Sequence, residues 1–134
     1  MVESTGPLTV VRKYFDALAA KDFPAVAAQF ADDIVWHQPG GHQFSGTHRG
    51  GAAVGQLIGG MMATSEGTFE LSLTGPLMVN GAVVSVPIHF SGKREGAAMG
   101  QDGVDVLRVE GDRIAEVWLF SSDPESEDAF WGAA

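Results

Sequence analysis

AVVSVPIHFSGKREGAAMGQDGVDVLRVEGDRIAEVWLFS, the stretch from residue 82 to residue 121, decides the fold class because strand-like runs fill most of it. Together with one run before it, the chain has four such runs: Phe69 to Thr74, Ala82 to Ser91, Ala97 to Val109 and Ile114 to Ser121. Between them stand short segments of turn-forming residues: Gly75-Pro76, Asn80-Gly81, Ser91-Gly92 and Glu110-Gly111-Asp112. Short connections join antiparallel neighbours, so we expect an antiparallel meander. Pro87, inside the second run, predicts a bulge, a bend or a sheet edge at that point.

The chain before this stretch has the spacing of helices. Apolar residues recur at three- and four-residue steps: Leu8, Val11, Phe15 and Leu18. This spacing predicts a helix from about Pro7 to Lys21 with one apolar face. Asp22 is suited to cap a second helix, and a third is predicted from about Arg49 to Ala63. Gly55 and Gly59 in the third helix expose bare backbone, which permits close packing or leaves space for a ligand.

Two short elements complete the pattern. Ile34 to Gln38 is an apolar and aromatic run that the segment Pro39 to Gly41 ends, so we expect a brief strand entering a loop. Ser122 to Glu125 has the cap and first-turn residues of a short C-terminal helix, which carries Phe130 and Trp131. Three helices, a meander and a short helix within one domain of 134 residues belong to the α+β class. A strongly curved sheet would wrap the helices.

The charge and cysteine content narrow the class of protein. Eight Lys and Arg against 17 Asp and Glu give a net charge of −9, which repels nucleic-acid phosphates and anionic lipid head groups. The chain has no cysteine, so disulfides and thiolate ligands are excluded. Its first residues lack a secretory signal, and the longest mostly apolar run, Gly50 to Ala63, is too short to cross a bilayer. We therefore expect a cytoplasmic protein that binds neither nucleic acid nor membranes.

Asp105 is the acid whose position in the pattern stands out. Alternation along the third run places Val104, Val106 and Arg108 on one face and Asp105, Leu107 and Val109 on the other. Asp105 therefore lies on the more apolar face and is predicted to be buried. Burial raises the pKa of a carboxyl group and lets it donate a proton or a hydrogen bond. The alternative is a carboxylate whose hydrogen bonds a neighbouring hydroxyl or amide satisfies.

The histidines are the other candidates for chemistry. His37, His42 and His48 lie within twelve residues, but they straddle a strand end, a loop and a helix start, which is not the spacing of a metal site. We expect no metal. A loop imidazole at a pocket mouth is suited to act as an acid or base, and is otherwise simply solvated. The chain also lacks the glycine-rich loops that bind dinucleotides and phosphates, so no nucleotide cofactor is expected.

Five segments, in this order and spacing, resemble one known superfamily. They are Tyr14 to Asp22 (YFDALAAKD), Phe30 to Gly40 (FADDIVWHQPG), Gly46 to Gly50 (GTHRG), Val104 to Val109 (VDVLRV) and Arg113 to Trp118 (RIAEVW). Together they resemble the nuclear transport factor 2-like superfamily, and its SnoaL-like and ketosteroid-isomerase-like members most of all. The similarity extends over nearly the whole chain.

This resemblance implies a cone-shaped barrel in which a curved, mainly antiparallel sheet and three helices enclose an apolar pocket for a small hydrophobic ligand. It also implies a homodimer. By position, Tyr14 matches the tyrosine and Asp105 the protonated aspartic acid of the isomerase oxyanion hole. Gln38 stands where the isomerase has its aspartate base. An amide cannot shuttle protons, so His37, His42 or another group would supply the base.

The same resemblance implies a set of apolar residues that line or back the pocket: Trp36, Val84, Val86, Ile88, Phe90 and Leu107. On the last strand, Val117 and Leu119 alternate with Trp118 and Phe120, and alternation alone leaves open which pair faces inward. Analogy with the superfamily favours Val117 and Leu119.

Two functions remain as hypotheses. The first is a small enzyme without a cofactor that performs acid/base chemistry on a hydrophobic carbonyl compound, such as polyketide cyclisation, isomerisation or dehydration. The second is a non-catalytic member of the fold that binds a hydrophobic ligand or assembles as a dimer, and the missing base favours it. Epoxide hydrolysis would need an Asp-Arg-Asp set, which the sequence does not show.

Overall fold

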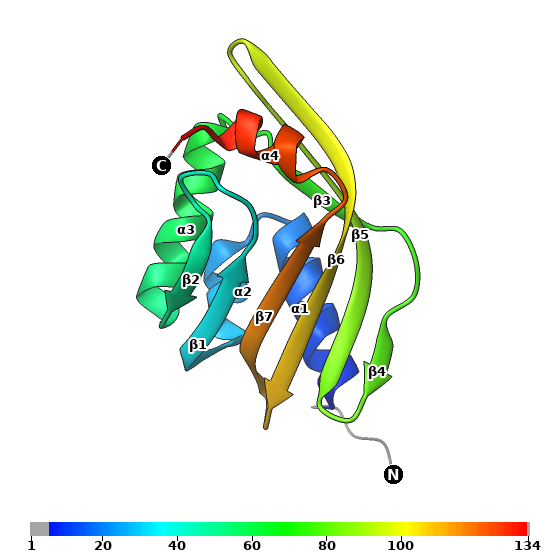
Figure 1. The fold of residues 1–134 in the computed structure, drawn as a ribbon. Helices are drawn as coiled ribbons and strands as arrows, with labels where there is room; N and C mark the ends of the chain where they lie inside the picture. Colours follow the sequence, from blue (N-terminus) through cyan, green and yellow to red (C-terminus); the bar gives the residue numbers. More distant parts are fainter. Residues whose placement is uncertain (1–5, 134) are drawn as a thin grey trace.

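A computed structural model describes residues 6–133. In chain order its elements are α1 (Pro7–Ala19), α2 (Phe23–Ala28), β1 (Phe30–Gln38), β2 (Gly46–Arg49), α3 (Gly51–Thr64), β3 (Glu70–Leu73), β4 (Met78–Asn80), β5 (Val83–Arg94), β6 (Ala97–Glu110), β7 (Arg113–Ser121) and α4 (Pro124–Trp131) (Figure 1). No helix within this part of the chain is long and apolar enough to span a membrane.

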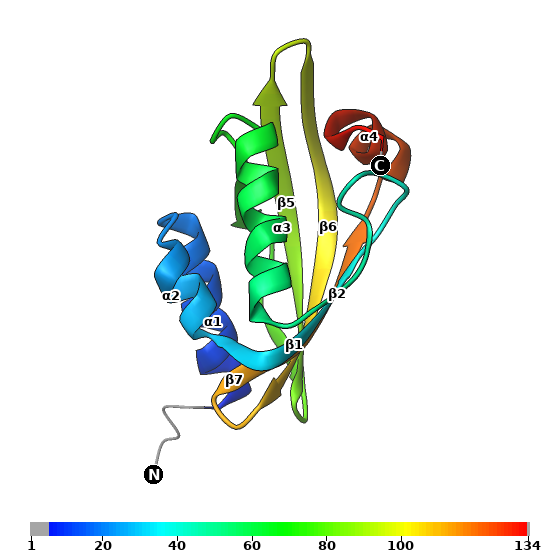
Figure 2. The ribbon, with the colours of Figure 1, turned by 90° about the vertical axis from the view of Figure 1, so that its left-hand side faces the viewer.

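The strands form one curved sheet that does not close on itself. Its order is β2-β1-β7-β6-β5-β3, and β4 pairs with β5 beside β3. Every pair is antiparallel except β1 and β7, which run parallel. Figure 2 shows α1, α2 and α3 on one side of this sheet. The predicted α+β class, with a curved and mainly antiparallel sheet around three helices and a short C-terminal helix, is confirmed.

The first two helices form for the reasons that the sequence indicates. The apolar face of α1 buries Val10, Val11, Tyr14 and Phe15. Asp22 caps α2, because its side chain accepts a hydrogen bond from the main-chain N–H of Ala25 at 3.3 Å. The buried side chains of these helices join those of the sheet in one hydrophobic cluster.

The turn predicted at Ser91-Gly92 is wrong, because β5 continues to Arg94 and turns at Glu95-Gly96. Gly92 is paired with Met99 inside the ladder. A side chain at Gly92 would begin 3.2 Å from the ring of Phe130 in α4, so this glycine serves close packing and not chain reversal. The glycine of the true turn, Gly96, has a φ of +79°, which suits glycine.

Pro87 lies at a local sheet edge and produces no bulge. Its pairing with Val104 belongs to an unbroken register between β5 and β6. On the other side of β5, β4 pairs with residues 83–85 and β3 with residues 88–91, so Pro87 stands in the gap. Its missing N–H is therefore not needed for pairing, while its carbonyl accepts a hydrogen bond from the main chain of Thr74 at 3.0 Å.

The C-terminal helix α4 is tied to the sheet through Gln101 of β6. The Gln101 side chain donates to the carbonyl of Asp123 at 3.0 Å and accepts from its N–H at 2.9 Å. Asp123 in turn caps α4 by accepting from the N–H of Ser126. The helix also touches the loop between β1 and β2, where Gln43 donates to the carbonyls of Trp131 and Gly132. These contacts set α4 over the end of the sheet that carries the pocket.

Candidate active site

A pocket lies between the helices and the sheet face that they cover. The space between its walls that is free of protein atoms is about 680 Å³, and part of it is open to solvent. Most of its wall is apolar. The exceptions are five polar or ionisable side chains, each from a different helix or strand: Tyr14, Gln38, Asp105, Ser121 and Glu127.

Asp105 lies in the middle of β6, opposite Val86 on one neighbouring strand and Leu119 on the other. Its side chain is buried, and it makes no hydrogen bond to any residue within 6–133. Burial raises the pKa of Asp105 to about 8, and the charge of Glu127 adds to the rise. Asp105 is therefore protonated at neutral pH, and its O–H is available to a ligand.

Tyr14 reaches the same pocket from α1. Its ring packs edge to face on Phe15, with 4.9 Å between centroids, and lies against Phe30. Burial raises the pKa of Tyr14, and the charge of Asp105 raises it further, so the two groups are close enough to interact electrostatically. Tyr14 thus remains a neutral phenol. The pocket wall therefore carries two hydroxyl donors, Tyr14 and Asp105.

Gln38 ends β1 with its side chain on the pocket side, in line with Trp36 two residues before it. The indole Nε1–H of Trp36 donates to Gln38 Oε1 at 3.0 Å. The NH₂ group of Gln38 and the second lone pair of its amide oxygen are left for a ligand. Gln38 therefore offers a hydrogen-bond donor at the position where the resemblance places a base.

Glu127, on α4, is a functional candidate that the sequence analysis missed. It is buried, and its two carboxyl oxygens accept hydrogen bonds from Ser121 Oγ and, at 3.3 Å, from Trp131 Nε1. Burial raises the pKa of Glu127. The signal was present, because Glu127, Phe130 and Trp131 follow the i, i+3, i+4 spacing of one helix face.

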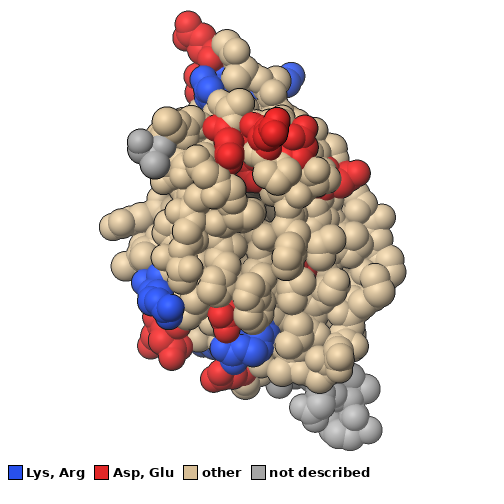
Figure 3. Space-filling model, viewed as in Figure 1, with Lys and Arg blue, Asp and Glu red and all other residues tan. Residues whose placement is uncertain are grey.

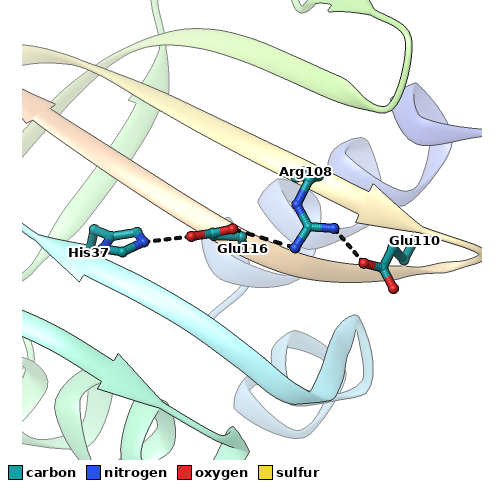
Figure 4. Close-up of polar contacts among 4 residues, drawn as sticks. All are labelled: His37, Arg108, Glu110 and Glu116. Carbon is teal, nitrogen blue, oxygen red and sulfur yellow. Dashed lines mark hydrogen bonds and ion pairs between the residues drawn. The ribbon is translucent and has the colours of Figure 1, made fainter.

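His37 lies on the opposite face of the sheet from the pocket (Figure 4). Its Nε2 is 2.7 Å from Glu116 Oε2, and its ring stacks on Trp118. Arg108 donates to the other oxygen of Glu116 at 3.4 Å. Strand alternation explains the placement, since Trp36 and Gln38 face inward and the residue between them faces outward. The sequence analysis expected His37 at the pocket, and the structure does not place it there.

His42 is buried in the loop between β1 and β2 and does not line the pocket. Its Nδ1 accepts a hydrogen bond from the N–H of Phe44 at 3.1 Å, so the proton of the neutral ring is on Nε2. Nε2 has no partner within residues 6–133. Burial lowers the pKa of His42. His48 donates to the carbonyl of Phe44, and no group of metal-binding side chains gathers in the described part of the chain.

Residues 11–117 match the family model of the SnoaL-like domain. The chain belongs to the SnoaL-like domain family. An uncharacterized protein of Mycobacterium tuberculosis is 30% identical over 125 residues, which cover 92% of this chain and 95% of that protein. A protein of unknown function with a cystatin-like fold from Xanthomonas campestris is 44% identical, with a TM-score of 0.91 over 95% of this chain and 98% of that one. A putative ketosteroid isomerase from Kribbella flavida is 23% identical, with a TM-score of 0.66 over 86% of this chain and 76% of that one, and shares the fold.

The apolar residues expected at the pocket of this SnoaL-like domain divide into two groups. Trp36, Ile88, Phe90 and Leu119 line it. The others are fully buried in the core and do not line the pocket: Val84, Val86, Leu107 and Val117. Three of these form one cross-strand row, Val84 beside Leu107 and Leu107 beside Val117, which lies one step along the sheet from the Asp105 row. On β7, Val117 and Leu119 face the helices, and the neighbouring Trp118 lies beside His37 on the outer face.

The polar groups of the SnoaL-like pocket differ in whether they donate or accept hydrogen bonds. Asp105 and Tyr14 are donors with no acceptor among residues 6–133, Gln38 is an amide donor, and Glu127 is a carboxyl group that accepts two hydrogen bonds. Such a set can bind a carbonyl oxygen at one point of the wall and approach the carbon next to it from another.

Proposed function

We propose that this pocket is the active site of an enzyme that needs no cofactor and moves protons on a hydrophobic carbonyl compound. Polyketide cyclisation, isomerisation and dehydration are reactions of this type. The observation that carries the proposal is the place of Asp105: a buried carboxyl group in the same pocket wall as Tyr14, without a hydrogen-bond partner among residues 6–133. Burial raises the pKa of Asp105 to about 8, which favours the protonated form at neutral pH. An unpaired polar group in an apolar wall costs stability, which is expected where a ligand completes the hydrogen bonds.

The chemistry follows from where charge develops. When a carbonyl compound loses a proton from the carbon next to the carbonyl, negative charge collects on the oxygen. Tyr14 and Asp105 would donate to that oxygen, and a donor of this kind contributes about 3 kcal/mol to lowering a barrier. The similarity in fold to a putative ketosteroid isomerase supports the same class of reaction.

Binding of 2-naphthol tests the proposal, because its anion resembles an enolate and its fluorescence distinguishes anion from neutral form. We expect the protein to bind the anion and to lower the apparent pKa of the naphthol. Tyr14→Phe and Asp105→Leu should each weaken binding about tenfold or more, since each removes one donor. Asp102→Leu is the matched control on the same strand, where the side chain is 76% exposed.

The alternative function is a non-catalytic protein that binds hydrophobic ligands. Such a protein would bind naphthalene and 2-naphthol with similar affinity, because apolar contact alone would hold both. It would show no preference for the anion, and the two donor variants would behave like Asp102→Leu. That result would contradict the proposed enzyme.

A further inference from the structure

The pocket needs a base, and the residue at the expected position is not one. Gln38 offers an amide NH₂, and its oxygen is already bonded to Trp36. His37 lies on the outer face of the sheet, and His42 does not line the pocket. Within residues 6–133, the titratable side chains that line the pocket are Tyr14, Asp105 and Glu127.

Resting on the proposed function, we propose that Glu127 is the catalytic base of this pocket, and that its carboxylate removes a proton from the carbon next to a carbonyl group held by Tyr14 and Asp105. This role is new to the site, because the sequence analysis placed the base on β1 or the loop after it. Here the base comes from the C-terminal helix, on the other side of the bound molecule.

The geometry places Glu127 within reach of one small substrate. Its carboxyl group is bonded to Ser121 Oγ, and Ser121 pairs with Gly103 on β6. Gly103 lies two residues from Asp105 on the same face of the strand, a separation of roughly 7 Å. Ser121, with the Glu127 carboxyl group bonded to it, therefore lies one step along the pocket wall from Asp105, and the charge of Glu127 acts on Asp105.

Two contacts fix the orientation of the Glu127 carboxylate. Ser121 Oγ and Trp131 Nε1 donate to different oxygens, so the group cannot rotate freely. Ser121 and Trp131 also line the pocket themselves. A base held at a defined angle to the substrate carbon is what proton abstraction requires.

The environments of the two carboxyl groups assign their roles. Burial raises the pKa of both carboxyl groups, but hydrogen bonds from Ser121 and Trp131 oppose the rise at Glu127. No residue within 6–133 donates to Asp105, whose pKa is raised to about 8, so Glu127 is the group that ionises first. Repulsion between them disfavours ionising both. The charged and titratable groups that act on this pair are Tyr14 from α1 and Asp128 from the same helix as Glu127. One acid and one base in a pocket is the arrangement of acid/base enzymes.

The step is balanced without a further reactant. The C–H bond next to the carbonyl breaks, and its proton forms an O–H bond on Glu127. The electron pair of that bond becomes the C=C bond of the enolate, and the carbonyl π pair moves to the oxygen, where Tyr14 and Asp105 donate. Glu127 then returns the proton to the same carbon or to another, which gives exchange or isomerisation.

Exchange of the α-protons of 2-tetralone in D₂O, followed by proton NMR, tests the role directly. We expect the wild type to exchange them faster than buffer does, with a rate that falls as the pH is lowered and Glu127 becomes protonated. Glu127→Gln keeps the shape but not the base, and should reduce the rate about a hundredfold or more. Glu127→Asp keeps a carboxylate and should retain part of the wild-type exchange rate. The matched control is Glu125→Gln, an exposed position on the same helix.

The naphthol assay separates this inference from the proposed function. Glu127→Gln should still bind the 2-naphthol anion, because Tyr14 and Asp105 are intact. Circular dichroism of the variant is the control for its folding. If Glu127→Gln exchanges 2-tetralone like the wild type, the inference is overturned and the proposed function stands. The inference about Glu127 is also overturned if the wild type binds the 2-naphthol anion but exchanges the 2-tetralone protons no faster than buffer does. If the wild type shows no preference for the anion, the proposed function itself is overturned.

Discussion

Asp105 couples the stability of the protein to pH. In the folded protein it keeps its proton up to about pH 8, whereas an aspartate in an unfolded chain releases its proton near pH 4. Between these values the folded state binds more protons than the unfolded state, so the free energy of unfolding falls as the pH rises. Glu127, whose pKa is also raised, acts in the same direction.

Asp105→Asn should therefore remove much of this pH dependence. We expect the wild type to lose roughly 1 kcal/mol of stability per pH unit between about pH 5 and 7, and the variant to lose clearly less. Urea unfolding over this pH range measures both slopes. Asp102→Asn, at an exposed position of the same strand, should leave the slope as it is. Identical slopes for Asp105→Asn and the wild type would show that Asp105 is ionised in the folded protein.

Gln38→Asp should add a carboxylate at the end of β1, facing the two donors. We expect this variant to isomerise an unsaturated ketosteroid measurably, and the wild type to do so little, because an amide has no basic lone pair near neutral pH. Absorbance of the conjugated product follows the reaction. Steroid binding without any gain in rate would contradict the alignment of Gln38 with the isomerase base.

The candidate residues show what strand alternation does and does not predict. Alternation on β6 predicted the burial of Asp105, and the same rule applied to β1 would have placed His37 outside, since its neighbours Trp36 and Gln38 face inward. Glu127 was missed because an acid on a helix is usually solvated. Its spacing with Phe130 and Trp131 pointed to a buried face, and the packing of α4 against Ser121 and Gln101 shows that Glu127 is buried.

At the scale of elements, α4 depends on the amide of Gln101. Gln101→Ala would leave the main-chain N–H and carbonyl of Asp123 without their partners, which costs about 2 kcal/mol. Because α4 carries Glu127 and Trp131, we expect binding of 2-naphthol to weaken as well. Urea unfolding and naphthol titration measure the two effects. Asp102→Ala, the neighbouring exposed residue, should change neither, and unchanged stability of Gln101→Ala would show that α4 is held by its apolar contacts alone.

The elements that the sequence did not predict are held by the strands next to them in the chain. β2 and β4 are short and mostly exposed, and they exist because β1 and β5 offer them unpaired edges. Their sequences carry no strand periodicity of their own. The sequence placed the end of β5 too early, because glycine is typical of turns. Gly92 instead lies within the strand and leaves room for the ring of Phe130. The long alternating runs of β6 and β7, by contrast, were located closely from the sequence.

At the scale of the whole molecule, the outer face of the sheet is open. Figure 3 shows acidic side chains gathered over α4, while the middle of this face has few charged groups. Apolar side chains stand there on β6 and β7, among them Val104, Val106 and Trp118, and Phe120 is 55% exposed. The curved sheet around three helices followed from the resemblance to a superfamily. The parallel pairing of β1 with β7 was not predicted, because local patterns do not specify which distant strands meet.

The predicted homodimer would cover this outer face. We expect sedimentation to show a dimer for the wild type and a monomer for Val106→Glu, since a charge in the middle of an apolar interface costs several kcal/mol. Val79→Glu, at an exposed apolar position on β4, is the matched control and should remain a dimer. A wild type that sediments as a monomer at high concentration would contradict the prediction.

The hydrogen-bonded indoles of the pocket make the protein its own optical reporter. Of the three tryptophans in the chain, Trp36 and Trp131 line the pocket, and the Nε1–H of each donates to a polar side chain of the pocket, Gln38 or Glu127. Indole emission responds to the polarity and charge around that nitrogen. A ligand that enters the pocket, or a proton that arrives on Glu127, would therefore change the emission without any added label, and natural ligands could be screened by their quenching of it.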